Sequence, residues 1–239
     1  ALAQGFVASL TQGAGQFCTN PGLVIALQGT ALDRFIAAAA DAVGRSHAQT
    51  MLTPGIFDAY QTGTGALAGH AVAVAAGPSA EGPNQCQPRL FTTTARDFLA
   101  NPALQAEIFG AASLIVQCAD GEEVRQVAEH LEGQLTATLH LDDGDLQAAR
   151  TLLPTLERKA GRLLVNGWPT GVEVCDAMVH GGPFPATSDV RSTSVGTAAI
   201  LRFLRPVCYQ DFPDSLLPAA LQHDNPLQLR RLLDGQREA

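Results

Sequence analysis

Hydrophobic and polar positions alternate along most of the chain between the two-residue period of strands and the longer period of helices. The predicted strands are residues 23–27, 70–75, 89–94, 112–118, 136–141 and 162–166, and the predicted helices are residues 1–14, 31–43, 120–131, 145–159 and 195–203. Strands and helices that alternate in this way imply right-handed crossovers. The pattern therefore predicts an α/β fold with a mostly parallel sheet flanked by helices.

Two of these segments carry further local signals. Residues 112–118 (ASLIVQC) are almost continuously apolar, which is typical of a strand inside a parallel sheet. Asp120 stands directly before an acidic first turn and is a good N-cap for the helix that follows. We expect the first segment to lie inside the sheet.

Other stretches have no regular period. Residues 81–88 and 167–194 are rich in Gly, Pro, Ser or Thr, and a loop as long as the second is usually functional or disordered. Residues 205–210 (RPVCYQ) are predicted to be extended, and the tail from residue 214 to residue 239 is predicted to be helical and charged.

Composition excludes several classes of protein. The 239 residues are 46% hydrophobic and 16% charged, so the chain can bury a sizeable core. The net charge of −8 argues against nucleic acid and anionic membranes as partners. No apolar run approaches the ~20 residues of a membrane span, and residues 1–10 lack the features of a signal peptide.

The cysteines point to a reducing compartment. There are five of them, well spread and without a C-x-x-C pair: Cys18, Cys86, Cys118, Cys175 and Cys208. This usage favours a cytoplasmic protein over a disulfide scaffold, and it argues against a zinc site. The histidines at positions 47, 70, 130, 140 and 223 show no metal-ligand spacing either, so no metal is expected.

The segment GQFCTNPG, residues 15–22, holds the strongest candidate for chemistry. It presents Cys18 between a turn of small residues and a Pro-Gly stop, where a helix end or backbone N–H groups can activate a thiol. The alternative is a buried structural cysteine. The flanking residues favour a nucleophile, and Phe17 beside it is a candidate for the wall of a substrate pocket.

Residues 107–110 (EIFG) form a second candidate, just before the apolar strand. The Glu107 carboxylate can accept hydrogen bonds from two ribose hydroxyls, and Phe109 can pack against a nicotinamide ring. A phenylalanine at such a position is alternatively a core residue.

The loop of residues 165–185 is the third candidate. It carries Trp168, the only tryptophan, together with His180 and Phe184, and it can wall an apolar pocket. It can equally be a surface excursion with one packing tryptophan. His180 is either a general base for Cys18 or an ordinary hydrogen-bonding group.

These segments together resemble the NAD(P)-dependent aldehyde dehydrogenases. The resemblance begins at GQFC (15–18), continues through EIFG (107–110) and reaches about residue 213. Residues 163–213, beginning LLVNGWPTG and including HGGPFPATSD, are similar to the α-ketoglutaric semialdehyde (2,5-dioxopentanoate) dehydrogenases in particular.

The resemblance implies a catalytic domain over residues 1–204, followed by an oligomerisation strand and tail over residues 205–239. Cys18 would attack an aldehyde carbon, and the reaction would proceed through a thiohemiacetal and a thioester, with NADP or NAD as cofactor. Glu107 would hold the nicotinamide ribose and Phe109 would border the ring. The strand at residues 205–210 would join a neighbouring subunit, which predicts a homo-oligomer.

The resemblance also implies that parts of the enzyme lie outside this chain. The family places its cysteine in the middle of a chain roughly twice as long. Its glycine-bearing dinucleotide unit, its asparagine oxyanion donor and its water-activating glutamate all precede the segment found here. We therefore expect the N-terminal cofactor-binding domain to be absent, cofactor affinity to be negligible and the isolated chain to be inactive.

The resemblance implies an aldehyde substrate, α-ketoglutaric semialdehyde, which is oxidised to 2-oxoglutarate. Its carboxylate would suit an arginine, and Arg191 in the loop is the candidate. Two other functions remain open at this point. One is a non-catalytic assembly module, and the other is a cofactor-independent hydrolase that uses Cys18 with His180.

Overall fold

The computed structural model describes residues 1–237, which divide between Arg202 and Phe203 into two units. The first unit contains a four-stranded sheet with the order β1-β6-β5-β3. Its strands are β1 (Leu23–Leu27), β3 (Val72–Ala76), β5 (Arg89–Thr94) and β6 (Ala112–Cys118). β6 is parallel to both β1 and β5, whereas β3 is antiparallel to β5. The predicted α/β fold with a mostly parallel sheet is confirmed.

β6 lies inside this sheet, as its apolar sequence predicts. Alternate side chains of a strand point to opposite faces. Ile115 accordingly packs in one core with Leu90, while Leu114 and Val116 pack with Phe91 in another. All of these side chains are buried, so both faces of the sheet are covered by helices.

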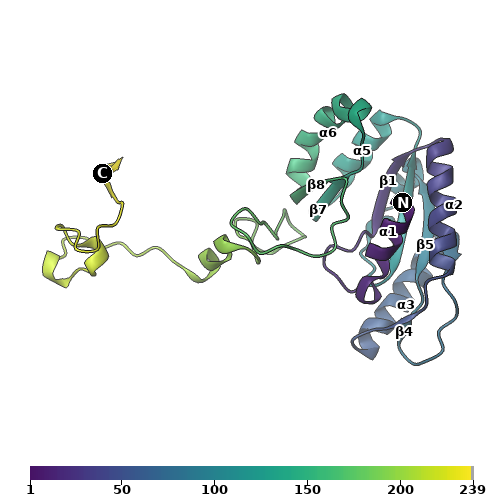
Figure 1. Ribbon diagram of the computed structural model, residues 1–239, viewed down its shortest axis with the longest axis horizontal. Coiled ribbons are helices and arrows are strands. Elements are labelled where there is room, and N and C mark those ends of the chain that lie inside the picture. The colour runs from purple at the N-terminus through teal and green to yellow at the C-terminus, as the bar shows by residue number, and fades with distance from the viewer. Residues whose placement is uncertain (238–239) are drawn as a thin grey trace. The chain divides into compact units, whose positions relative to one another are not determined.

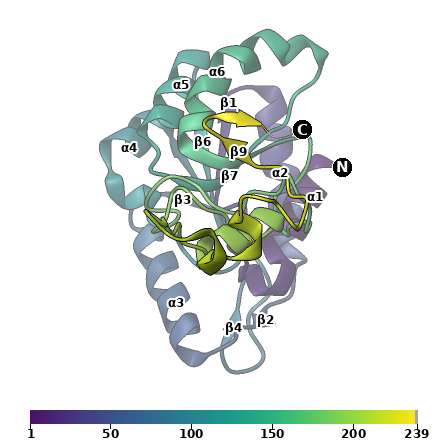
Figure 2. The same cartoon turned by 90° about the vertical axis from the view of Figure 1, so that its left-hand side faces the viewer.

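Two sets of helices cover the two faces (Figures 1 and 2). The helices of this part are α1 (Leu2–Thr11), α2 (Thr30–Gly44), α3 (Pro54–Ala68), α4 (Ala95–Ala100) and α5 (Gly121–His130). α1 and α2 pack on the face of Ile115 through Phe6, Leu10 and Val43. α4 and α5 pack on the other face through Phe98 and Val127. The Asp120 side chain caps α5 by accepting a hydrogen bond from the Glu123 N–H, as predicted.

A second, two-stranded parallel sheet follows along the chain. It pairs β7 (Gln134–Leu139) with β8 (Ala160–Val165) through the crossover helix α6 (Leu146–Lys159). Every residue of β7 is only partly buried, in contrast with β6. β2 (Gln49–Thr50) and β4 (Gln85–Cys86) form a short antiparallel pair.

The sequence pattern missed two helices, α3 and α4. α3 contains Gly55, Gly63 and Gly65, which lower helix propensity and obscure the period. Its helical signals are nonetheless present. The Thr53 side chain caps the helix, Pro54 occupies the first turn, and Tyr60, Thr64 and Leu67 form its buried face.

The end of the chain differs from its prediction. Residues 195–203 give a 3-10 helix, η4 (Thr197–Phe203), rather than an α-helix. The predicted helical tail is wrong, because residues 214–237 hold two short 3-10 helices (Asp214–Leu216 and Ala219–Leu221) and the hairpin of β9 (Leu232–Leu233) and β10 (Gln236–Arg237). Prolines at positions 213, 218 and 226 recur too closely for an α-helix to continue between them.

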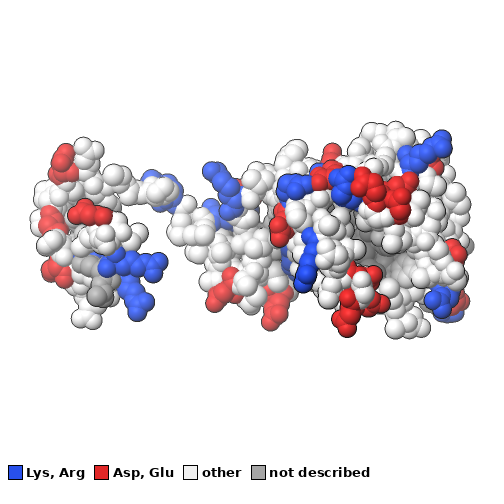
Figure 3. Space-filling model, turned by 90° about the horizontal axis from the view of Figure 1, so that it is seen from above, with Lys and Arg blue, Asp and Glu red and all other residues white. Residues whose placement is uncertain are grey.

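On the face drawn in Figure 3, acidic and basic side chains lie interspersed, without a broad field of one sign among the residues drawn there. Of the helices described, none is long and apolar enough to cross a membrane.

Candidate active site

Cys18 lies in a turn that begins with three left-handed residues. α1 ends at Thr11 rather than at residue 14, and the 3-10 helix η1 (Gln12–Gly15) follows it. Gly15 has a φ of 71°, and a Cβ atom built on it would lie 2.3 Å from the backbone nitrogen of Ala111. Only glycine fits there, because both the backbone conformation and the close approach exclude a side chain. This contact sets the Cys18 turn directly against the end of the EIFG loop.

Hydrogen bonds hold the rest of the turn. The backbone N–H of Asn20 donates to the Phe17 carbonyl at 3.0 Å, which closes the turn around Cys18. The buried Thr19 hydroxyl donates to the Pro169 carbonyl at 2.8 Å, and the Asn20 side-chain amide donates to the Leu10 carbonyl at 2.8 Å. The turn is therefore tied to α1 and to the loop that follows β8, while the Cys18 side chain itself stays exposed.

Cys18 differs from the two cysteines inside the sheet region. Cys86 and Cys118 are buried, and burial raises the pKa of both thiols, that of Cys118 to about 11. Such thiols stay protonated and inert near neutral pH. Cys175 and Cys208 are exposed like Cys18, but neither lines the large cavity beside the Cys18 turn.

A large cavity of about 1520 Å³ opens beside the Cys18 turn. Five of the predicted site residues line it: Phe17, Cys18, Glu107, Phe109 and Trp168. The Glu107 side chain is exposed and Phe109 is 39% exposed, in a loop without regular structure directly before β6. The structure thus brings the GQFC and EIFG segments to one cavity, although they are far apart in the sequence. A hydrogen bond from the Ser113 hydroxyl to the Pro21 carbonyl likewise joins residues that are 92 positions apart.

The His180 side chain contacts Cys18, although the two residues are 162 positions apart in the sequence. Its Nε2 atom lies 3.1 Å from the Cys18 Sγ atom. The Thr193 hydroxyl accepts a hydrogen bond from the His180 N–H at 2.8 Å, and both the N–H and the hydroxyl of Ser194 donate to the His180 carbonyl. Burial and, secondarily, the charge of Arg162 lower the pKa of His180, which favours the neutral imidazole.

The loop that carries His180 rests on the β7–β8 sheet through backbone contacts. A Cβ atom on Gly161 would lie 2.1 Å from the Gly181 carbonyl oxygen, and one on Gly133 would lie 2.1 Å from the Pro183 carbonyl oxygen. The Arg162 guanidinium donates to the carbonyls of Pro169 and Gly171. The sequence pattern predicted no role for Arg162. The feature that could have indicated one is its position as the single charged residue of an otherwise apolar strand.

Trp168 also packs against other rings, and two predicted pocket residues lie outside the cavity. Trp168 packs on the Phe6 ring, with 5.3 Å between centroids, and on the His140 ring at 4.4 Å, so it joins α1 to the loop as well as lining the cavity. Phe184 is 76% exposed and does not line the cavity. Arg191 does not line it either, because its side chain is 92% exposed on a turn beside Asp189.

Comparison with known proteins defines the class of this fold and site. The chain belongs to the aldehyde dehydrogenase superfamily, as a homologue of its α-ketoglutaric semialdehyde dehydrogenases. It is 61% identical to α-ketoglutaric semialdehyde dehydrogenase 2 of Azospirillum brasilense, in an alignment that covers 100% of this chain and 46% of that protein. It is 49% identical to the α-ketoglutaric semialdehyde dehydrogenase of Acinetobacter baylyi, over 98% of this chain and 45% of that protein. The chain therefore spans about half the length of the curated relatives it matches.

Solved structures agree on the fold. A 1-pyrroline-5-carboxylate dehydrogenase superposes with a TM-score of 0.63 at 22% identity, over 76% of this chain and 35% of that one. PnpE, solved in complex with nicotinamide adenine dinucleotide, gives a TM-score of 0.62 at 17% identity, over 75% of this chain and 38% of that one. No protein-family model matches the chain.

Proposed function

We propose that this chain forms the thiol-bearing part of an NAD(P)-dependent aldehyde dehydrogenase, with Cys18 as the nucleophile. One observation carries the proposal. In a chain homologous to such enzymes over its whole length, Cys18 is the only exposed cysteine among the described residues that lines the large cavity, and Glu107 and Phe109 line the same cavity. The names of the curated relatives support α-ketoglutaric semialdehyde as the substrate and 2-oxoglutarate as the product.

In this mechanism the Cys18 thiolate adds to the aldehyde carbon and forms a thiohemiacetal. The Cys18 backbone N–H donates a hydrogen bond to the oxygen on which charge develops. Loss of hydride from that carbon leaves a thioester on Cys18. Water then attacks the thioester carbonyl, and the carboxylic acid and the free thiolate are released. His180, neutral and 3.1 Å from the sulfur, holds the thiol side chain in the turn.

The residues at the cavity fit a nicotinamide nucleoside. Glu107 offers an exposed carboxylate that can accept hydrogen bonds from ribose hydroxyls, and Phe109 offers a partly exposed ring next to it. A nicotinamide held there by Glu107 and Phe109 would supply the hydride acceptor of the reaction. The choice between NAD and NADP rests on groups around the adenosine ribose.

A homo-oligomer remains part of the proposal. Residues 205–210 are the predicted intersubunit strand, and the segment around them exposes Phe203, Val207 and Phe212. Exposed apolar side chains in an extended segment suit strand addition to another chain.

The experiment that tests the nucleophile uses the chain's own cysteines as controls. Iodoacetamide alkylation of Cys18, Cys175 and Cys208, all exposed, is followed by mass spectrometry with and without α-ketoglutaric semialdehyde. We expect the aldehyde to slow alkylation of Cys18 alone, because only there does a thiohemiacetal form in a cavity. Equal protection of all three thiols would exclude a special role for Cys18. No aldehyde-dependent formation of NAD(P)H by the isolated chain is expected.

The contact between Cys18 and His180 favours a second candidate function, a cofactor-independent hydrolase. There the imidazole takes the thiol proton, the thiolate attacks an ester carbonyl, and water releases the acid after the alcohol has left. Hydrolysis of p-nitrophenyl acetate without NAD(P), lost in both Cys18→Ser and His180→Asn, would establish this reading in place of the first.

A further inference from the structure

Residues 168–170 join three parts of the first unit, and we call them the bridging segment. On one side they pack against α1. A Cβ atom on Gly5 would lie 2.7 Å from the Trp168 Nε1 atom, so this glycine leaves room for the indole. The Ser9 and Thr170 hydroxyls form a hydrogen bond with each other. The bridging segment is therefore fixed to the helix that leads into the turn of the proposed nucleophile.

The other two parts, the Cys18 turn and β8, meet at the carbonyl oxygen of Pro169. The Thr19 hydroxyl donates to this oxygen at 2.8 Å, and the Arg162 Nη2 atom donates to it at 2.7 Å. A carbonyl oxygen has two lone pairs and can accept both hydrogen bonds. Both terminal nitrogens of Arg162 also donate to the Gly171 carbonyl at 3.2 Å. The residue after Cys18 and the Arg162 guanidinium are thus joined through one oxygen atom.

Arg162 is a partly buried cation without an acidic partner among the described residues. The arginines that form ion pairs there all have exposed side chains: Arg45, Arg125, Arg158 and Arg191. The Arg162 Nε atom is buried, with no hydrogen-bond partner in that part of the chain. Burial of a charge without an opposite charge costs free energy, and an apolar residue would suit the strand at a lower cost. The guanidinium therefore points to a role that an apolar residue could not fill.

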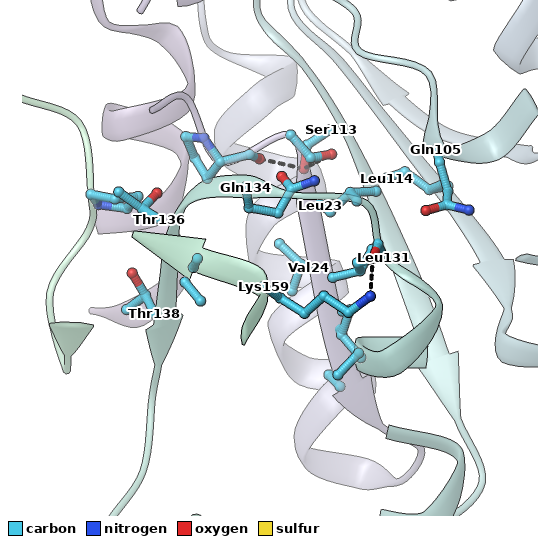
Figure 4. A pocket seen from close by; sticks show the side chains of 18 of the residues that line it. Leu23, Val24, Gln105, Ser113, Leu114, Leu131, Gln134, Thr136, Thr138 and Lys159 are labelled. Carbon is cyan, nitrogen blue, oxygen red and sulfur yellow. Dashed lines mark hydrogen bonds between the residues drawn. The ribbon is translucent and has the colours of Figure 1, made fainter. Parts of the chain in front are cut away.

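The geometry excludes direct contact between Arg162 and a molecule in the large cavity. Both terminal nitrogens face protein carbonyls, the Nε atom is buried, and Arg162 does not line the cavity. Lys159, directly before β8, shows the contrast. It lines the cavity and donates to the Leu131 carbonyl at 2.6 Å (Figure 4). Arg162 thus acts through the groups that it binds.

We propose that Arg162 is a positioning residue for Cys18. Its guanidinium holds the bridging segment on β8, and the Thr19 hydroxyl holds the Cys18 turn on the same carbonyl. The planar fork of arginine suits this task because it can donate to two carbonyls at fixed angles, whereas lysine is a point charge on a flexible stem. The inference rests on the proposed function, in which Cys18 is the nucleophile.

The same guanidinium acts on His180. The His180 Nδ1 atom is buried without a hydrogen-bond partner among the described residues, so no carboxylate orients the imidazole there. Burial first, and then the charge of Arg162, lower the pKa of His180. The neutral imidazole that results can accept the thiol proton at its Nε2 atom, 3.1 Å from the Cys18 sulfur. Arg162 therefore affects both partners of the contact between Cys18 and His180.

Four variants of the whole 239-residue chain test this inference. Arg162→Met removes the charge and the fork, and Arg162→Lys keeps the charge alone. Thr19→Val removes the other donor to the Pro169 carbonyl and leaves Arg162 in place. Arg158→Met is the matched control, because Arg158 is an exposed arginine whose ion-pair partner is Glu129.

Two quantities are measured for each variant. The rate of iodoacetamide alkylation of Cys18 is measured by mass spectrometry relative to that of Cys208, an exposed thiol outside the first unit. The titration of the His180 imidazole is followed by NMR. Neither measurement needs an aldehyde, so the results are independent of the aldehyde-protection experiment that tests the proposed function.

We expect Arg162→Met to slow the alkylation of Cys18 relative to Cys208 by about tenfold, because the thiol loses its well-placed proton acceptor. The same variant raises the pKa of His180. Thr19→Val slows the alkylation of Cys18 as well but leaves the His180 titration unchanged. Arg162→Lys gives an intermediate rate at Cys18 and the titration of the unmodified chain. Arg158→Met changes neither quantity.

An unchanged ratio of the Cys18 rate to the Cys208 rate in Arg162→Met would overturn the proposal, even if its Tm fell, because the residue would then be merely structural. Equal slowing in Arg158→Met would overturn it too, since any lost arginine would have the same effect. If Arg162→Met does not fold, the other two site variants decide, and unchanged Cys18 rates in both Thr19→Val and Arg162→Lys would overturn the proposal.

Discussion

The two loops that meet at the candidate site differ in what supports them. The Cys18 turn rests on the four-stranded sheet, where Gly15 abuts Ala111 at the start of the fully buried β6. The His180 loop rests on the β7–β8 sheet, whose first strand is only partly buried throughout. Local stability follows burial and contact density. Cys18, the proposed nucleophile, is thus held by the more buried region, and His180 by the less buried one.

This difference places the two groups in separate structural roles. A nucleophile must keep its position through the reaction, which calls for a support that does not yield. A partner that only orients the thiol can sit on a loop that moves.

The largest expected effect comes from Gly15→Ala, which disrupts the contact between the Cys18 turn and the start of β6. The new Cβ atom would meet backbone atoms of Ala111 and Gly110 at 2.3 Å, and alanine is strained at a φ of 71°. Neither neighbour is a flexible side chain that can move aside. We expect a loss of about 3–5 kcal/mol in the free energy of unfolding, measured by urea denaturation.

Gly22→Ala is the matched control for that substitution. Gly22 stands at the other end of the same segment, and a Cβ atom there would have no neighbour within 4 Å. A change below about 1 kcal/mol is expected. If both variants lost the same stability, the close approach at Gly15 would not be what holds the turn.

A smaller effect is expected from Gly161→Ala, which disrupts the contact between the His180 loop and β8. The new Cβ atom would press on the Gly181 carbonyl and push the loop away from β8. We expect a loss of about 1–3 kcal/mol, together with a change in the alkylation rate of Cys18 toward that of Cys208, because His180 moves away. The control is Gly167→Ala, where a Cβ atom meets nothing within 4 Å. A Cys18 rate that Gly161→Ala leaves unchanged would mean that the two loops are independent.

The sequence predicted the scaffold better than the contacts between its parts. The strands at 23–27, 89–94 and 112–118 were predicted at their observed bounds, because buried apolar runs and their ends are local signals. The Asp120 cap is local as well. The helix α3 was missed because its glycines mask its period, and the tail was predicted as helix although its prolines at positions 213, 218 and 226 recur too closely for a helix to continue between them.

The candidate site shows the same limit. Cys18, Glu107 and Phe109 were singled out by residue type and order, and their functional roles remain predictions. Sequence left open whether His180 meets Cys18, since that contact depends on close backbone approaches at Gly133 and Gly161. Arg162 was missed for a similar reason, because the carbonyls it binds are identified only by the path of the loop.

The smallest expected effect is on the pH dependence of stability. It tests whether His180 is shielded from solvent in the loop that rests on the β7–β8 sheet. Burial lowers the pKa of both His140 and His180 from 6.5, with the Arg162 charge a further cause at His180. The unfolded chain then binds protons more readily than the folded chain near that value. The stability contributed by the neutral imidazoles is therefore complete above about pH 7 and is lost as the pH falls through the ordinary histidine range. In His180→Asn, the drop in Tm between about pH 8 and about pH 5 should be smaller than in the unmodified chain. An identical drop would mean that His180 titrates as it does in the unfolded chain, and the loop would then be too open to hold it against Cys18.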